Sequence, residues 1–332
     1  MLKIGLVGCG GISGVHVPAW DKMDDAQLVA VCDIRPEKAE RYPGHKIYTD
    51  FDKMLEENDF DIIDICLPTF LHCEFAVKAM KKGINVLSEK PISLKESDVG
   101  LLFSTAKENG VKYMVAQVLR FWNEYEALKQ IYDTKKYGEL ISGTMWRLGG
   151  VPQGSWNDWY LKKELSGLIP FDLHIHDLDF LVYTFGAPKS YSCNRKERPE
   201  QDYMSVVYDY GDFFVTAEAA WYKASYAFCM GFRFQFENAI VALENDELTI
   251  YDCEGNRIKP CKNDGSAENQ SDFELPSSDG YANEIRYFAD CVKNNKPIEK
   301  VTEESLLTVL KILNQIKRFI RAVAMRQLFC CA

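Results

Sequence analysis

The chain has 332 residues, of which 47% are hydrophobic and 27% charged, and its formal net charge at pH 7 is −10. This length exceeds what one hydrophobic core usually organises, so we expect two domains. The negative charge argues against nucleic-acid and anionic-membrane partners, which need basic surfaces, and no apolar run approaches the roughly 20 residues of a membrane span. Residues 6–9 resemble a lipoprotein cleavage box, but too few residues precede Cys9 for a leader. We therefore interpret them as part of a strand and expect a cytoplasmic protein.

The first 33 residues have the pattern of a dinucleotide-binding unit. An apolar strand at 3–7 leads into a glycine-rich turn, a helix follows, and a second strand at 28–32 ends in an acidic residue. Glycines let the backbone approach a pyrophosphate at the helix N-terminus, and an acid at this spacing accepts hydrogen bonds from the adenosine ribose. The predicted cofactor-binding residues of this unit are Gly8, Gly10, Gly11, Ile12, Asp33 and Arg35.

Two positions of this unit bear on the cofactor. The third glycine of the G-x-G-x-x-G pattern is replaced by Ser13, which is small enough for helix–strand packing. A carboxylate at Asp33 would repel the 2′-phosphate of NADP by roughly 4 kcal/mol at 4 Å and an effective dielectric near 20. Arg35 could offset part of that repulsion. We predict that NAD is the cofactor and that NADP is less favoured.

Strands and helices alternate through the rest of the first 120 residues. Further strands are expected at 46–48, 61–67, 85–88 and 112–117, and helices at 36–41, 51–57, 71–82 and, after a capping box beginning at Ser93, up to about 109. This alternation predicts that residues 1–120 form an α/β Rossmann domain with a doubly wound parallel sheet, whose ligands bind beyond the carboxyl ends of the strands. Those ends add the candidate cofactor-binding residues Pro68, Thr69, Glu89, Lys90 and Gln117.

The pattern changes beyond residue 120. After a helix at 123–135, strands are expected at 140–148, 203–210, 213–222, 228–236, 239–243 and 248–251, with helical stretches at 167–186 and 302–325. Short turns between the strands indicate antiparallel hairpins. We therefore expect residues 121–332 to form an α+β domain with a mostly antiparallel sheet, for substrate binding and oligomerisation, whose last helix could pack back on the first domain. Open sheets often bury one face in an oligomer, which suggests a homo-dimer or homo-tetramer.

Four short segments occur in order across both domains. They are Gly8-Cys9-Gly10, the stretch from Leu67-Pro68-Thr69 to His72, Glu89-Lys90-Pro91, and the stretch from Asp172 to His176. Together they resemble the Gfo/Idh/MocA family of NAD(P)-dependent sugar and polyol oxidoreductases. In that family the E-K-P lysine lies near the nicotinamide and substrate, and the D-x-x-x-H pair lines the same site. The resemblance implies that Lys90, Asp172 and His176 are catalytic and that His72 belongs with the cofactor-binding residues.

The chemistry of these residue types agrees with that implication. Asp172 and His176 are four residues apart, so on a helix they share a face, and a carboxylate there raises the basicity of the imidazole. Oxidation of a secondary alcohol requires the hydroxyl proton to leave, and histidine suits that transfer. Lys90 could stabilise the developing alkoxide or relay the proton. The alternative is that Asp172 and His176 only solvate a helix surface. A metal site is not expected, because His174 and His176 would point about 200° apart on a helix.

Three further residues are candidates for substrate contact. His174 occupies the position that is often glycine in the family's D-x-G-x-H motif, so a second imidazole could reach the pocket or pack beside it. Arg120 could contact substrate or cofactor, or form a structural salt bridge. Trp159 offers an aromatic surface of the kind that flanks sugars, although core packing would explain it as well. The predicted substrate-binding residues are Lys90, Arg120, Trp159, Asp172, His174 and His176.

We expect an NAD-dependent dehydrogenase that acts on a secondary hydroxyl of a sugar, polyol or cyclitol. A relative that oxidises a glycoside transiently, to allow elimination or hydrolysis, is an alternative. A non-catalytic sensor of NAD and sugar is a second alternative, which the intact set of Lys90, Asp172 and His176 disfavours.

Overall fold

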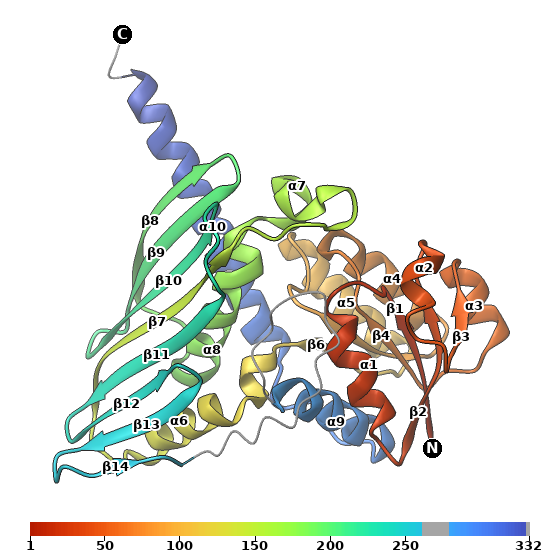
Figure 1. The fold of residues 1–332 in the computed structure, drawn as a ribbon, viewed down its shortest axis with the longest axis horizontal. Helices are drawn as coiled ribbons and strands as arrows, with labels where there is room; N and C mark the ends of the chain where they lie inside the picture. The colour runs from red at the N-terminus through yellow and green to blue at the C-terminus, as the bar shows by residue number, and fades with distance from the viewer. Residues whose placement is uncertain (261–278, 330–332) are drawn as a thin grey trace. The chain divides into compact units, whose positions relative to one another are not determined.

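The computed structural model describes residues 1–260 and 279–329, with side chains up to residue 317. It divides into two compact units (Figure 1), one formed by Met1–Trp122 with the described part of Asp264–Glu303, the other by Asn123–Asn263 with the described part of Glu304–Ala332. The chain crosses between units close to the expected boundary of 1–120 and 121–332. That boundary needs one correction, because residues 279–303 group with the first unit. The last helix groups with the second unit and not with the first.

The first unit is a doubly wound α/β domain. Its six strands pair in parallel in the order β3-β2-β1-β4-β5-β6, the order typical of a Rossmann fold. The strands are β1 Leu2–Val7, β2 Ala26–Cys32, β3 Lys46–Tyr48, β4 Ile62–Ile65, β5 Asn85–Glu89 and β6 Tyr113–Ala116. The helices are α1 Ser13–Asp21, α2 Pro36–Ala39, α3 Phe51–Glu57, α4 His72–Lys81, α5 Glu96–Glu108 and α9 Gly280–Lys293. The parallel sheet predicted from the sequence is confirmed. Of residues 6–9, the first two lie in β1, which ends at Val7.

Helix capping in this unit departs from the sequence-based expectation at one helix. The Asp50 side chain accepts a hydrogen bond from the backbone N–H of Lys53 at 3.0 Å and so caps α3. The capping box expected at Ser93 is wrong, because α5 begins two residues later than that box requires and Lys95 is its N-cap residue. Ser93 instead accepts from the backbone N–H of Lys95 and donates to Asp98 at 2.5 Å, which orders the turn that leads into the helix.

Helix α9 was not expected from the sequence. It packs against α1 in the first unit and buries Tyr281, Glu284, Ile285 and Phe288. This spacing is the apolar stripe of an amphipathic helix, with a charged residue in the middle of the stripe. The buried Glu284 therefore hid the periodicity that would have predicted the helix.

The second unit is built on an eight-stranded sheet of order β14-β13-β12-β11-β7-β10-β9-β8. Its strands are β7 Leu140–Gly150, β8 Ser190–Arg198, β9 Gln201–Asp209, β10 Phe214–Tyr222, β11 Cys229–Phe236, β12 Ala239–Glu244, β13 Glu247–Asp252 and β14 Arg257–Ile258. The expectation of antiparallel hairpins holds for every pair except β7 and β10, which are parallel. The edge strands β8 and β14 were missed, because β8 is polar and half exposed and β14 consists of only two residues, both exposed.

Helices cover one face of this sheet (Figure 1). They include α6 Asn123–Thr134, α8 Ile175–Phe185 and α10 Glu303–Phe329. Tyr125 of α6 packs edge-on against Phe180 of α8 and Phe232 of β11, with ring centroids 4.9 and 5.1 Å apart, so the core lies between these helices and the sheet. Within residues 1–260 and 279–329, no helix combines the length and apolarity needed to cross a membrane.

Candidate active site

Gly8 and Gly10 have different structural roles in the turn after β1. Gly8 has φ +95°, and a Cβ there would lie 2.4 Å from the carbonyl oxygen of Cys66, so only glycine allows the end of β1 to approach β4 this closely. Beside Gly10, a Cβ would meet nothing within 4 Å. That side of the turn is therefore open to a ligand, and Gly11 and Ile12 follow it, half-buried, into α1.

This contrast predicts different outcomes for two matched substitutions. Gly8→Ala should lower the free energy of unfolding by about 2–6 kcal/mol, because it adds backbone strain to a clash with a main-chain oxygen. Gly10→Ala should leave stability within about 1 kcal/mol but weaken NAD binding about tenfold or more, because the new methyl group occupies the approach to the turn. Urea unfolding and calorimetric titration with NAD measure both effects. Unchanged NAD affinity in Gly10→Ala would remove the turn from the cofactor site.

Ser13 takes the place of the third glycine without loss of packing. Its side chain is fully buried, donates to the carbonyl of Gly10 at 2.6 Å and is paired with the hydroxyl of Tyr42 at 2.9 Å. The serine therefore ties the turn to the start of α1 and to the segment after α2.

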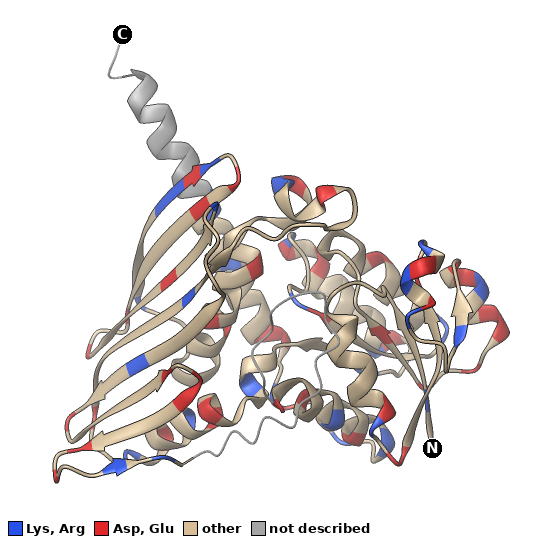
Figure 2. Ribbon diagram, in the orientation of Figure 1, with Lys and Arg blue, Asp and Glu red and all other residues tan. Residues whose placement is uncertain are grey.

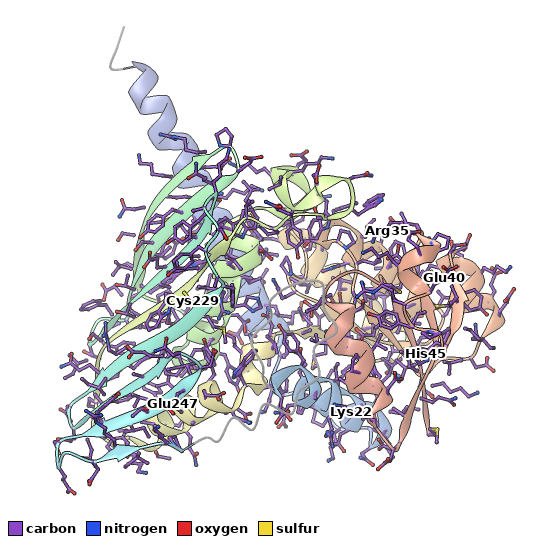
Figure 3. All side chains as sticks on the ribbon, in the orientation of Figure 1. Lys22, Arg35, Glu40, His45, Cys229 and Glu247 are labelled. Carbon is purple, nitrogen blue, oxygen red and sulfur yellow. The ribbon has the colours of Figure 1, made fainter. Side chains whose placement is uncertain are left out.

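The Asp33 carboxylate is held beside the turn by backbone groups. It accepts hydrogen bonds from the N–H of Cys9 and the N–H of Arg35, both at 2.9 Å. The Arg35 guanidinium, labelled at the edge of this unit in Figure 3, adds longer contacts of 3.2 and 3.4 Å. The backbone contacts fix the orientation of the carboxylate, whereas the Arg35 side chain is 27% exposed.

His72 has a structural role, which corrects its assignment as a cofactor contact. The ring is 1% exposed, and its two nitrogens lie 2.8 Å from the carbonyl of Pro91 and 2.7 Å from the carbonyl of Leu67. Burial lowers the pKa of this imidazole, and the two carbonyl contacts oppose the shift. A neutral ring has one N–H, which one of the two carbonyls accepts, so His72 lies between the segments that follow β4 and β5 and has no donor left for a ligand.

The ends of β4 and β6 supply further polar groups. Pro68 precedes a short turn at Thr69–Leu71, and Thr69 is buried. Gln117 follows β6 and is 2% exposed, and its carboxamide oxygen has no hydrogen-bond partner among the described residues. A buried acceptor without a partner costs roughly 1–3 kcal/mol, so a bound ligand that donates to Gln117 would be favoured.

Glu89 and Lys90 form the end of β5. One carboxylate oxygen of Glu89 accepts from the backbone N–H of Lys90 at 3.0 Å, and the other lies 3.1 Å from Nε2 of His16. Glu89 is only 6% exposed, while Lys90 is half-buried. Glu89 is therefore engaged in holding the main chain at Lys90, which leaves Lys90 as the residue of this motif that could reach a ligand.

Asp172 and His176 lie in the second unit on a helix that is not regular. The expected continuous helix at 167–186 is wrong, because Gly167 and Leu168 have φ of +76° and +61°. A π-helical turn spans Pro170–His174, and α8 then begins at Ile175. Asp172 is therefore on the π turn and His176 on the first turn of α8, both half-buried. Such π turns widen a helix and are frequent at functional sites.

His174 belongs to the core of the second unit, which corrects its assignment as a substrate contact. It is fully buried, and its Nε2 lies 2.6 Å from the hydroxyl of Tyr208 on β9. Burial, together with the positive charge of Arg147, lowers the pKa of His174 to about 3, so the ring is neutral at physiological pH. Arg147 is itself buried and paired with Asp177 at 3.0 Å.

Arg120 and Trp159 were the other candidates for substrate contact. Arg120 is 1% exposed and donates to the carbonyl of Lys300 at 2.6 Å, a structural use of the guanidinium, although the partner is a main-chain carbonyl and not the carboxylate of the expected salt bridge. Trp159 is half-buried and stacks on Tyr160 with ring centroids 4.1 Å apart. Trp159 thus remains a candidate, and Arg120 is better explained by packing.

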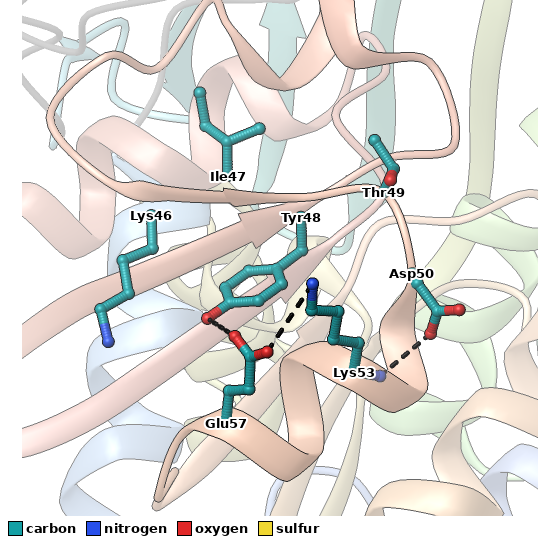
Figure 4. Close-up of a pocket in the computed structure, with 7 residues that line it drawn as sticks. All are labelled: Lys46, Ile47, Tyr48, Thr49, Asp50, Lys53 and Glu57. Carbon is teal, nitrogen blue, oxygen red and sulfur yellow. Dashed lines mark hydrogen bonds and ion pairs between the residues drawn. The ribbon is translucent and has the colours of Figure 1, made fainter.

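A hollow of about 410 Å³ lies along β3 and α3 (Figure 4), lined by Lys46, Ile47, Tyr48, Thr49, Asp50, Lys53 and Glu57. Its polar groups satisfy one another, since Tyr48 donates to Glu57 at 3.1 Å and Lys53 pairs with the same carboxylate at 3.7 Å. The lining has no buried polar group that needs a partner, so we assign no ligand to it.

The two halves of the chain match two models of one protein family. Residues 2–117 match the model described as "Oxidoreductase family, NAD-binding Rossmann fold", and residues 125–239 match the model described as "GFO/IDH/MocA C-terminal domain". The chain belongs to the Gfo/Idh/MocA oxidoreductase family.

Among the Gfo/Idh/MocA relatives, the glucose-6-phosphate 3-dehydrogenase of Bacillus subtilis is 26% identical over 64% of this chain and 64% of its own length. The 2,7-anhydro-N-acetylneuraminate hydratase of Mediterraneibacter gnavus is 28% identical over 54% of this chain and 48% of its own length. The chain thus spans about half to two thirds of these curated relatives. An Agrobacterium radiobacter oxidoreductase in complex with NAD⁺, L-tartaric acid and magnesium has the same fold, with a TM-score of 0.77, 18% identity and 94% coverage of both chains.

The residues of the first unit fit the NAD of this Gfo/Idh/MocA family. The open side of Gly10 could receive the pyrophosphate, the oriented carboxylate of Asp33 could receive the ribose, and the unpartnered oxygen of Gln117 could receive a donor. When bound, NAD supplies a hydride acceptor. Sequence reasoning missed two polar residues behind this edge, His16 and Asp64, which are both fully buried. The sequence did contain one sign of them, because Asp64 is a charged residue within the otherwise apolar strand β4.

Proposed function

We propose that the protein is an NAD-dependent dehydrogenase that removes hydrogen from a secondary hydroxyl of a sugar, polyol or cyclitol. One combined observation supports the proposal. This member of the family has a dinucleotide turn that is open beside Gly10, a lysine at the end of β5 (Lys90), and the pair Asp172 and His176. The glucose-6-phosphate 3-dehydrogenase among its relatives acts on an alcohol of this kind.

Each of the three residues has a role in the proposed reaction. Oxidation converts the substrate carbon from alcohol to ketone, with loss of a hydride from carbon and a proton from oxygen. His176 would accept the hydroxyl proton, and Asp172 would stabilise the imidazolium that results. The ammonium of Lys90 would stabilise the oxygen while it carries negative charge. In the reverse direction the same groups return the proton to a ketone.

An assay of net NADH formation tests the proposal. D-glucose, D-glucose 6-phosphate, methyl glucosides and myo-inositol would be offered with NAD, and NADH would be followed by its absorbance. We expect at least one of these compounds to give NADH and the matching ketone in equal amounts. The absence of NADH from every sugar, polyol and cyclitol tested, together with recovery of these compounds unchanged, from a protein that binds NAD, would favour the non-catalytic sensor.

Transient oxidation of a glycoside is the second candidate function. The hydratase among the relatives acts, by its name, on an anhydro-sugar without net oxidation. Such an enzyme would return the hydride to its product, so sugar would be released or rearranged without accumulation of NADH. Product analysis of the same incubations separates the two functions.

The preference for NAD over NADP is a separate prediction. The oriented carboxylate of Asp33 would face the ribose hydroxyls, and a 2′-phosphate would be repelled by it. We expect NAD to bind at least about tenfold tighter than NADP and Asp33→Ser to reduce this ratio. Calorimetric titrations with both cofactors measure it, with Glu37→Gln on α2 as a charge-matched control. Tighter binding of NADP by the unaltered protein would contradict the assignment.

We also propose that the protein is a cytoplasmic homo-dimer or homo-tetramer that uses the sheet of the second unit. The sheet face away from α6 and α8 exposes Tyr203, Phe214, Ile240 and Tyr251, and charged side chains are sparse along its strands (Figure 2). Apolar faces that are exposed in a single chain are commonly covered by a second copy in an oligomer. Light scattering coupled to size-exclusion chromatography measures the mass of the protein in solution and tests this proposal, because a monomer would contradict it.

A further inference from the structure

We propose that His16 is a positioning residue, which links Glu89 to Asp64 and thereby holds the backbone of Lys90 in place. The inference rests on the proposed function, because Lys90 is the group being positioned. His16 lies on α1, outside the segments that carry the family resemblance.

The geometry joins one helix to two neighbouring strands. Nδ1 of His16 lies 2.8 Å from a carboxylate oxygen of Asp64 on β4, and Nε2 lies 3.1 Å from a carboxylate oxygen of Glu89 at the end of β5. The imidazole is fully buried, as is Asp64, and Glu89 is 6% exposed. The contacts continue from the second oxygen of Glu89 to the N–H of Lys90, 3.0 Å away. A chain of three hydrogen bonds therefore connects the interior of β4 to the main chain of Lys90.

Asp64 is fixed independently of Glu89. The indole N–H of Trp20, one turn after His16 on α1, donates to the same Asp64 oxygen at 2.7 Å. Asp64 is thus anchored by two donors from one helix face. The contact from His16 to Glu89, at 3.1 Å, is the one that connects the end of β5 to α1 and Asp64, so in this proposal the position of the strand end depends on the Nε2 donor.

Both ring nitrogens face carboxylates, and both can donate only when the ring is protonated. Burial disfavours that charge, but Asp64 outweighs the burial and raises the pKa of His16 well above its ordinary value. The other groups around the ring are Cys66, directly after β4, and Tyr281 and Glu284 on α9. Burial and the nearby Asp64 raise the pKa of Cys66 to about 12, so this thiol adds no negative charge at neutral pH.

The sign of the pH dependence follows from the raised pKa. The contribution of the protonated His16 to the free energy of unfolding is complete below about pH 6.5, which is the ordinary pKa of histidine in an unfolded chain. This contribution is lost as the pH rises through the folded-state pKa of His16. Above that pH the ring can donate to only one carboxylate. If the remaining N–H is on Nδ1, Glu89 keeps only the N–H of Lys90, while Asp64 keeps both His16 and Trp20.

A cation bound in this cluster is the competing explanation. The ligand atoms of His16, Asp64 and Cys66, and those of His16, Glu89 and Glu284, lie within 4.8 Å of one another. The imidazolium already provides the positive charge between Asp64 and Glu89 and satisfies one oxygen of each, so the structure favours the protonated ring over a metal.

Two amide substitutions separate positioning from simple packing. The amide nitrogen of His16→Gln can take the place of Nε2 and still donate to Glu89, whereas that of His16→Asn takes the place of Nδ1 and donates only to Asp64. Both remove the charge and leave the same helix. The two variants should therefore have similar free energies of unfolding, but the backbone at Lys90 should be held in place only in His16→Gln.

The first measurement needs no substrate. Hydrogen exchange of the segment 88–92, followed by mass spectrometry with NAD present, should be about tenfold faster in His16→Asn than in the unaltered protein. Exchange in His16→Gln should remain near that of the unaltered protein. Raising the pH should accelerate exchange in the unaltered protein beyond the intrinsic pH effect, and His16→Gln should lack this extra acceleration. Equal exchange in the two variants would overturn the proposal.

The second measurement uses one compound from the NADH assay described above, the panel of sugars, glucosides and myo-inositol, namely the one that gives the fastest NADH formation. We expect kcat to fall about 10- to 100-fold in His16→Asn, because small displacements of a reacting group are costly, and to recover in His16→Gln, with the Kd for NAD within about threefold in both. Full activity in His16→Asn combined with loss of activity in Lys90→Met would overturn this inference alone. Full activity in Lys90→Met would overturn the proposed function instead.

Two further results complete the test. If both His16 variants fail to fold, Glu89→Gln should reproduce the faster exchange of the Lys90 amide, because a neutral carboxamide interacts more weakly with His16; unchanged exchange there would count against the proposal. Loss of activity on treatment with a chelator, reversed by added zinc or magnesium, would show a metal in the cluster and contradict the protonated bridge.

Discussion

Replacement of Lys90 by methionine should reduce turnover about 10²- to 10⁴-fold, the range typical for loss of a group that stabilises charge or transfers a proton. Methionine keeps most of the length of the side chain and removes its charge. The backbone contact between Lys90 and Glu89 does not depend on the side chain, so the end of β5 should keep its conformation. We therefore expect the Kd for NAD to change by no more than a few-fold.

Steady-state kinetics and calorimetry measure these two quantities on the same preparations. Lys82→Met is a matched control, because Lys82 is an exposed lysine at the end of α4 in the same unit. The control should retain full turnover. Unaltered turnover in Lys90→Met would exclude a catalytic role for this lysine.

Replacement of His176 by asparagine should cause a loss of similar size, about 10²- to 10⁴-fold in kcat. The carboxamide can form hydrogen bonds with substrate but cannot accept the hydroxyl proton. Solvent hydroxide would then have to remove it, so the residual rate should increase with pH. Asp172→Asn should have a smaller effect, because the imidazole remains and loses only its carboxylate neighbour.

A pH profile of kcat for the three proteins checks this prediction. His45→Asn serves as a control, since that imidazole lies before β3, outside the candidate site, and contacts Asp21 and the carbonyl of Leu28. A His176→Asn variant with the rate and pH profile of the unaltered protein would show that another group accepts the proton.

The sequence was sufficient to predict the features that depend on local pattern. The βαβ unit from β1 to Asp33, the parallel order of the first sheet and the strand end at Glu89 and Lys90 all follow from apolar runs, glycines and their spacing. The need for glycine at position 8 could be anticipated as well, although its cause, the carbonyl of Cys66, is a contact with a distant strand.

The errors concern contacts between segments far apart in the chain. His174 was expected among the substrate contacts because it takes the place of glycine in the D-x-G-x-H motif, but Tyr208 of β9 contacts it in the core. His72 was expected at the cofactor, yet its ring nitrogens contact the carbonyls of Pro91, 19 residues away, and Leu67, 5 residues away. The parallel pairing of β7 with β10 and the partners of His16 likewise depend on tertiary structure, which periodicity does not report.

Transfer of a labelled hydrogen tests the central claim most directly. A substrate from the panel, carrying deuterium on the carbon that bears the reacting hydroxyl, would be incubated with the protein and NAD, and the reduced cofactor analysed by mass spectrometry. We predict one deuterium in each molecule of reduced cofactor and an equal amount of ketone. Deuterium that appears in solvent or stays in a product with unchanged oxidation state, with no labelled cofactor accumulating, would contradict the assignment as a dehydrogenase.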